Sequence, residues 1–67
     1  MQEKIRQIQD HYKKEFLASA GVGNIMVIII KRNRRKNEIT IENFNKKSVE
    51  EIINEIEEQL GGKNEKN

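Results

Sequence analysis

The chain has 67 residues with a formal net charge of +2, and it contains no cysteine and a single histidine, His11. A chain this short forms one domain at most and buries only about 60% of the surface that it exposes when unfolded. Without cysteine it has no disulfide and no thiolate metal site, so its stability depends on close packing or on a partner chain. This elimination is a first indication of an oligomer.

Charged residues make up 36% of the chain and are unevenly distributed. Residues 21–37 carry five positive and no negative charges, whereas residues 38–67 carry four positive and eight negative charges. The longest apolar run, residues 25–30, is far shorter than the roughly 20 residues that span a bilayer, and no signal peptide is evident. We therefore expect a cytoplasmic protein without membrane contact. The abundance of Ile, Lys, Asn and Glu is typical of an AT-rich genome, such as that of a low-GC bacterium or its phages.

Residues 2–18 predict an amphipathic helix. Apolar side chains recur there at helical spacing, and the positions between them are filled mainly by good helix formers. The apolar positions are Ile5, Ile8, Tyr12 and Phe16. Gly21 and Gly23 are expected to end this helix, because glycine readily adopts the left-handed conformation found at helix C-termini.

Two strands are predicted next. Residues 25–30 are almost entirely β-branched and indicate a strand buried on both faces, and residues 38–42 alternate strictly, as a strand with one wet face does. The intervening residues 31–37 are expected to form a hairpin connection. A tight hairpin would place Ile30 opposite Ile39 and Ile28 opposite Ile41.

The C-terminal helix has the clearest signals. Ser48 and Glu51 have the spacing of a capping box, in which each side chain accepts from the other residue's backbone N–H. A clean apolar stripe follows at Val49, Ile52, Ile53, Ile56 and Leu60. Gly61 and Gly62 are expected to end the helix, so residues 1–62 form the predicted domain and residues 63–67 a disordered polar tail.

The predicted fold class is therefore α+β, a small single domain of order α-β-β-α in which an antiparallel hairpin is flanked by two amphipathic helices. We expect the helices to cover the sheet face that carries Met26, Ile28, Ile30, Ile39 and Ile41. The opposite face would leave Ile25, Val27, Ile29 and Phe44 in water. Each such side chain gains about 1.5–3 kcal/mol on full burial, so these four predict a homodimer interface.

No arrangement of residues indicates catalysis. His11 and Asp10 are adjacent and would point about 100° apart on a helix, so His11 is interpreted as a solvent-facing residue. Gly21-Val22-Gly23-Asn24 resembles a glycine-rich phosphate loop only weakly, because such loops follow a strand and open a helix. We expect a protein that is not an enzyme and that binds neither cofactor nor metal.

The most informative feature is a run of cations that the hairpin connection does not need for folding: Lys31, Arg32, Arg34, Arg35 and Lys36. Clustered cations repel one another, but they can neutralise phosphates, and a basic two-stranded ribbon can enter the major groove of DNA. They therefore predict contact with nucleic acid. Two alternatives remain for the role of these cations: they contact an acidic protein surface, or they only protect the apolar strand of residues 25–30 from aggregation.

The leading hypothesis is a small non-catalytic protein that contacts nucleic-acid phosphates through these five cations. The alternative is a protein-binding regulator or inhibitor, encoded by a phage or mobile element, that uses the uncovered sheet face or the acidic C-terminal helix. That helix carries Glu50, Glu51, Glu55, Glu57 and Glu58, which we interpret first as a solvated face. A purely structural oligomer subunit is a third reading. Two small nucleic-acid-binding folds do not fit the predicted α-β-β-α order. A double-stranded-RNA module would require a third strand, and the ribbon-helix-helix fold has a different order of elements.

Overall fold

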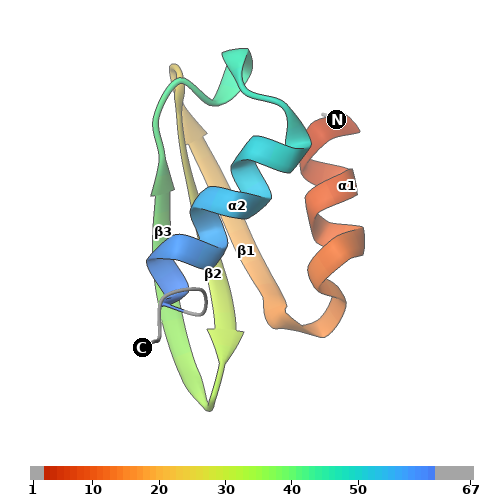
Figure 1. Ribbon diagram of the computed structural model, residues 1–67, viewed down its shortest axis with the longest axis vertical. Helices are drawn as coiled ribbons and strands as arrows, with labels where there is room; N and C mark the ends of the chain where they lie inside the picture. Colours follow the sequence, from red (N-terminus) through yellow and green to blue (C-terminus); the bar gives the residue numbers. More distant parts are fainter. Residues whose placement is uncertain (1–2, 62–67) are drawn as a thin grey trace.

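The computed structural model, which describes residues 3–61, contains a three-stranded antiparallel sheet with helices on one side of it (Figure 1). The element order is α-β-β-β-α, so the predicted α+β class with a hairpin is confirmed, with one strand more than expected. The elements are α1 (Glu3–Tyr12), the 3₁₀ turn η1 (Lys13–Glu15), β1 (Phe16–Val22), β2 (Ile25–Arg32), β3 (Arg35–Ile41), the 3₁₀ turn η2 (Phe44–Lys46) and α2 (Val49–Leu60). The predicted tail, residues 63–67, lies outside the described residues.

The prediction of one helix over residues 2–18 is wrong in its second half. Helix α1 ends at Tyr12, and Lys13 adopts a positive φ of 55°, which an α-helix does not allow. Residues 16–22 form β1 instead. Phe16 continues the helical spacing of α1 by coincidence, because it packs against the core from the first position of a strand.

The two glycines expected to end that helix have other roles. Gly23, with φ +62°, and Asn24 form a two-residue turn that joins β1 to β2. A positive φ at the first turn residue is what a type II′ hairpin turn requires, and glycine adopts it without strain. Gly21 lies within β1, opposite Met26.

The β2–β3 hairpin is longer and tighter than predicted. Only Asn33 and Arg34 form the turn, so the flanking cations belong to the strands. The observed register places Ile28 opposite Ile39, and Ile30 lies opposite Asn37, which makes the expected register wrong by two residues. Because side chains alternate with a period of two, a shift of two leaves every residue on its predicted face.

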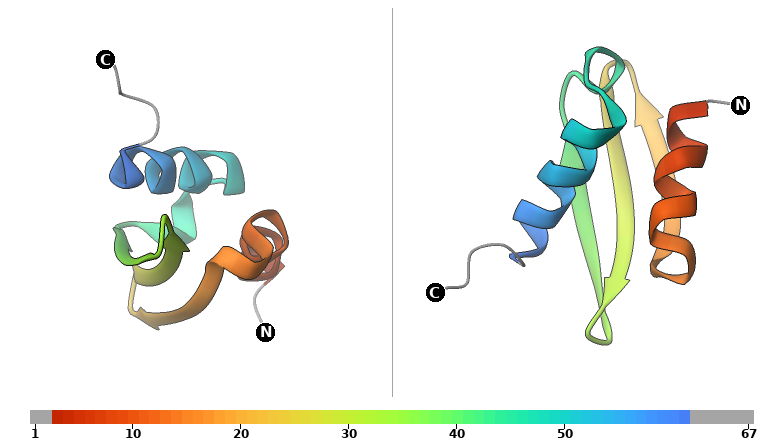
Figure 2. Two further views of the ribbon diagram at one scale, coloured as in Figure 1. Left: turned by 90° about the horizontal axis from the view of Figure 1, so that it is seen from below. Right: turned by 45° about the vertical axis from the view of Figure 1, so that its right-hand side comes forward.

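Both helices lie on the same face of the sheet, as the view from below shows (Figure 2). The core between them contains Ile8, Tyr12, Met26, Ile28, Ile30, Ile39, Ile41, Phe44, Ile52 and Ile56. The start of α2 is as predicted, because the Ser48 hydroxyl accepts from the Glu51 N–H while the Glu51 carboxylate accepts from the Ser48 N–H. Gly61 closes the helix with φ +78°. No helix within residues 3–61 is long and apolar enough to cross a membrane.

Phe44 does not lie on the uncovered sheet face, so this part of the interface prediction is wrong. It is only 2% exposed and belongs to the core. Asn43 adopts the left-handed conformation, with φ +54°, and turns the chain back after β3. The Phe44 N–H then donates to the Asn24 carbonyl at 2.8 Å, and the Lys4 ammonium donates to the Phe44 carbonyl at 2.9 Å.

The face of the sheet away from the helices, called the open face below, carries apolar residues of β1 and β2. Val22 is 79% exposed and Ile25 is 43% exposed, whereas Val27 and Ile29 are half-buried by their neighbours. Thr40 lies opposite Val27, and Glu38 lies opposite Ile29, so the open face becomes polar towards β3. The predicted exposure of this face is therefore observed for Ile25 and only in part for Val27 and Ile29.

Candidate nucleic-acid interface

The turn of the β2–β3 hairpin holds two residues in the left-handed conformation, with φ +56° at Asn33 and φ +65° at Arg34. Two positive φ angles define a type I′ turn, which favours Asn-Gly because its second position suits glycine. Arginine has a Cβ, so the left-handed conformation costs it about 1–2 kcal/mol. An arginine thus occupies a position where glycine would be more stable.

Four of the five predicted cations are exposed: Lys31, Arg34, Arg35 and Lys36. The register places Lys31 opposite Lys36 and Arg32 opposite Arg35, so like charges face each other across the strands at two successive positions. Directly opposed like charges destabilise an antiparallel pair. The hairpin therefore holds its cations together at a cost to stability.

Arg32 has a different role from its neighbours. Its Nε and Nη2 donate to the two oxygens of Glu15 at 3.1 and 3.0 Å, and its Nη1 donates to Glu57 Oε1 at 2.9 Å. Its side chain is only 30% exposed. Arg32 thus ties β2 to η1 and to α2 and is committed to carboxylates within the domain.

Tyr12 extends the Arg32–Glu15–Glu57 cluster to α1, because its hydroxyl donates to Glu57 Oε2 at 2.6 Å. Burial and the Glu57 carboxylate raise the pKa of Tyr12. Hydrogen bonds from Arg32 lower the pKa of Glu15. Burial alone would raise the pKa of Glu57, but the hydrogen bonds from Tyr12 and Arg32 outweigh it and lower the pKa. Both carboxylates are therefore held in the ionised form.

Two further cations, Lys13 and Lys14, lie at the hairpin end of the molecule and were missed by the sequence analysis. Both are exposed on η1, which the Arg32–Glu15 ion pair holds beside the hairpin (Figure 1). Because they lie in a segment predicted to be helical, no sequence signal connected them with the hairpin. We call the six exposed cations at this end the basic end: Lys13, Lys14, Lys31, Arg34, Arg35 and Lys36.

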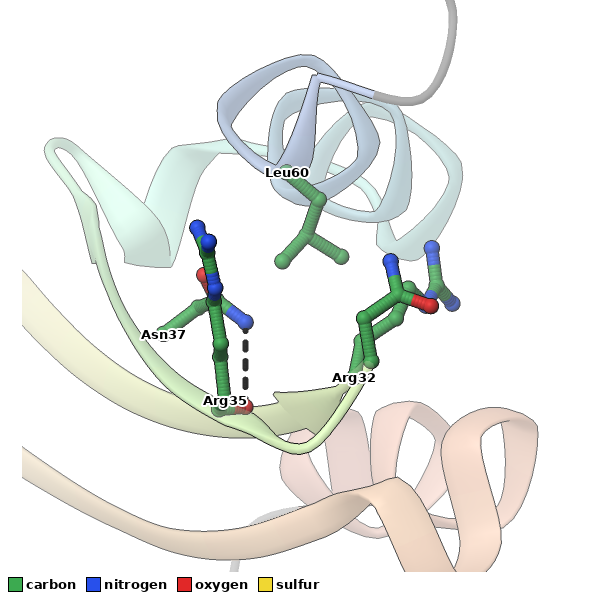
Figure 3. Close-up of a pocket in the computed structure, with 5 residues that line it drawn as sticks. Arg32, Arg35, Asn37 and Leu60 are labelled. Carbon is green, nitrogen blue, oxygen red and sulfur yellow. Dashed lines mark hydrogen bonds between the residues drawn. The ribbon is translucent and has the colours of Figure 1, made fainter.

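A shallow open cavity of about 360 Å³ lies between the hairpin and the end of α2 (Figure 3). Arg32, Asn33, Arg35 and Asn37 line it, and Leu60 forms its apolar side. The Asn37 amide donates to the Ile30 and Arg35 carbonyls at 3.2 and 3.3 Å, which fixes its orientation. The cavity adds a recess to the basic end, bordered by the Arg35 guanidinium, which makes no ion pair within residues 3–61.

The acidic residues of α2 are largely used within the domain. Glu51 belongs to the capping box, Glu55 pairs with Lys47, and Glu57 binds Arg32 and Tyr12. Only Glu50 and Glu58 remain exposed without such a contact in the described residues. This leaves a smaller acidic surface than the five glutamates of the sequence indicated.

The histidine considered above for a catalytic role lies in the last turn of α1. His11 is exposed near the end of α1, with its ring 4.7 Å from that of Tyr12 in an edge-on arrangement. Among residues 3–61, no three His, Cys, Asp or Glu side chains are grouped as a metal site would require. The notable chemistry of the described surface is therefore the cationic hairpin end and the apolar open face.

Comparison of the chain with protein-family models, with curated proteins and with solved structures gives no match.

Proposed function

We propose that this protein is a small, non-catalytic binding protein that contacts nucleic-acid phosphates through its basic end. One observation carries the proposal: exposed cations are held directly opposite one another, next to an arginine in a left-handed conformation that glycine would adopt more easily. Both features destabilise the hairpin. A phosphate backbone supplies the negative charge that offsets this repulsion.

The shape and composition of the hairpin favour a double-stranded ligand. A two-stranded ribbon is narrow enough to enter the major groove of B-DNA, which is about 12 Å wide. The hairpin turn and its flanking cations include no aromatic side chain, so the base stacking typical of single-strand binders has no platform there. Since the third strand that a double-stranded-RNA module requires is present, duplex RNA belongs in the same test.

Fluorescence anisotropy with labelled duplex DNA and duplex RNA, titrated from about 50 to 200 mM salt, tests the proposal. Each phosphate contact contributes about 0.9 to the slope of log K against log salt. We expect the double variant Arg34→Gly/Arg35→Ala to weaken binding on every sequence tried and to reduce this slope by about 1.8, the sum for two contacts.

Lys46→Ala is the matched control, because Lys46 is an exposed cation on η2, away from the hairpin turn. It removes one charge without touching the basic end and should leave affinity and slope almost unchanged. If neither duplex binds the unmutated protein at low salt, or if Lys46→Ala weakens binding as much as a hairpin substitution, the proposal fails.

The apolar open face supports a second candidate function, a regulator or inhibitor that binds another protein, such as one encoded by a phage or mobile element. The observation in its favour is the exposure of Val22 and Ile25 at 79% and 43%. A hydrophobic interface responds little to salt. Binding of a partner protein that persists at high salt and is lost in Ile25→Lys would favour this function over phosphate binding.

We also propose that the protein works as a homodimer in the cytoplasm. The support for a dimer is the small size of the domain together with the apolar open face, where Ile25, Val27 and Ile29 lie side by side at alternate positions of β2. A two-fold contact is the commonest way to cover such a surface.

A further inference from the structure

Strand β1 is an edge strand with unusual exposure. It pairs with β2 on one side only, and all of residues 17–22 are exposed, on both faces of the sheet. Its sequence, Phe-Leu-Ala-Ser-Ala-Gly-Val, contains no charge and no proline. Within residues 3–61, no group outside β2 hydrogen-bonds to the backbone of residues 17–22. Its outer N–H and C=O groups are thus available to another strand.

The opposite edge, β3, is protected in two ways. The Gln59 side chain on α2 covers its backbone at Thr40, donating to the Thr40 carbonyl at 2.9 Å and accepting from the Thr40 N–H at 3.4 Å. Exposed charges also lie along it at Arg35, Lys36 and Glu38. Charged side chains and covering groups are the usual means by which proteins prevent edge-to-edge pairing. The domain covers and charges its β3 edge, whereas within residues 3–61 the β1 edge has neither protection and shows only an irregularity in its pairing with β2 between Phe16 and Ala18.

We propose that β1 pairs antiparallel with β1 of a second copy, joining two three-stranded sheets edge to edge. A second copy fits because the strand is uncharged, so identical strands meet without repulsion. Its central side chains, Ala18, Ser19 and Ala20, are small and do not obstruct the approach. This inference rests on the homodimer proposed above but places its contact at the β1 edge, which leaves Ile25, Val27 and Ile29 on the joined open face uncovered. It does not depend on nucleic-acid binding.

The same pairing joins the apolar parts of the two open faces. Ala20 lies opposite Val27, and Val22 lies opposite Ile25, so the apolar half of the open face extends across β1 to its free edge. The charged half lies towards β3, which stays at the outer rim. A two-fold axis at the middle of β1 places Ser19 beside its own copy and directs the two β2–β3 hairpins to opposite ends of the joined sheet.

Sedimentation equilibrium of the full chain over a range of micromolar concentrations tests the contact. The unmutated protein should approach twice its monomer mass of 7.9 kDa. Ala20→Lys places a charge at the proposed seam on an exposed position and should raise the dimer dissociation constant at least about tenfold, since each copy then presents a lysine to the other. Thr40→Lys is the matched control, because it adds the same charge to the same sheet face at the protected edge.

Amide hydrogen exchange distinguishes strand pairing from packing of the open faces. Residues 17–22 should gain protection as the protein concentration rises, while circular dichroism confirms that both lysine variants stay folded. A mass of 7.9 kDa at all concentrations would show that the homodimer itself is wrong. A dimer that tolerates Ala20→Lys, or that dissociates equally in Thr40→Lys, would overturn β1 pairing while leaving a dimer in place.

Discussion

Replacing Arg32 by alanine tests whether this residue is a structural link, distinct from the phosphate-binding cations around it. The guanidinium makes a two-point contact with Glu15 and a further contact with Glu57. Its removal leaves two carboxylates close together, with side chains 37% and 24% exposed, and the Tyr12 hydroxyl bound to one of them. The variant thus loses attraction and gains repulsion at the junction of α1, η1, β2 and α2.

The expected loss is about 2 kcal/mol of unfolding free energy. Exposed ion pairs contribute about 0.2–1 kcal/mol each, and hydrogen bonds to charged groups contribute up to about 3 kcal/mol. The contacts of Arg32 with Glu15 and Glu57 are partly solvated, so their combined contribution to stability falls between these limits. At about 0.05–0.15 kcal/mol per residue, the whole domain has only about 3–10 kcal/mol. The melting temperature should fall by about 8–16 °C.

Urea denaturation followed by circular dichroism at neutral pH measures this loss, with Arg35→Ala as the control. Arg35 is exposed, makes no ion pair among residues 3–61 and lies opposite Arg32, so its replacement should leave stability unchanged or raise it by up to about 0.5 kcal/mol as the like-charge repulsion is removed. In acid the difference between Arg32→Ala and the unmutated protein should shrink, because protonated carboxyls no longer need the guanidinium. Equal stability of the two at neutral pH, or a loss independent of pH, would refute a structural role for Arg32.

Three further predictions concern stability. Arg34→Gly should raise the unfolding free energy by about 1 kcal/mol, since it relieves a left-handed arginine; a decrease in urea denaturation would contradict the strain assigned to the turn. The unmutated protein should lose stability as the pH falls below 4.5, the ordinary pKa of glutamate. The folded-state pKa values of Glu15 and Glu57 are lowered, so their contribution to stability is complete above that pH and disappears when they are protonated; a thermal-melt series that stays flat in acid would oppose this. Phe44→Ala should cost about 3–5 kcal/mol because Phe44 is buried, and a loss below about 1 kcal/mol would show that it does not pack in the core.

Helix α2 and the core face of β2 and β3 could be predicted from the sequence because each has a strong local signal. The Ser48–Glu51 capping box and the apolar stripe after it define the start and buried side of α2. The alternation around Ile39 and Ile41 gives the buried side of β3, and this side survives an error of two residues in register.

Strand β1 could not be predicted, because residues 17–22 lack the sequence pattern typical of a strand. A strand with one buried face alternates between apolar and polar residues, and that alternation is its sequence signal. Residues 17–22 are exposed on both faces and show no such period. Leucine and alanine are also good helix formers, so the sequence predicts that the preceding helix continues into this segment. The remaining signal was Gly23-Asn24, a dipeptide suited to a two-residue hairpin turn.

The ligands of Arg32 and the position of Phe44 depend on tertiary structure. Glu15 and Glu57 lie 17 and 25 residues from Arg32 in the chain. The local sequence, in which Arg32 is one of five cations, therefore could not identify them as its ion-pair partners. Phe44 follows β3 at a spacing that predicts the open face. The left-handed Asn43 reverses the chain and sends it into the core.

The order of strands in the sheet, β1-β2-β3, has a consequence for how the chain folds. Each strand pairs with its neighbour in sequence, and both connections are two-residue turns. Such hairpins close within about 1–10 μs, and local pairings shorten the search for the native topology. Contacts between the two helices join residues much further apart in the chain, such as the hydrogen bond between Tyr12 of α1 and Glu57 of α2, which are 45 residues apart. We therefore expect the sheet to form early and the docking of α1 against α2 to close the domain last.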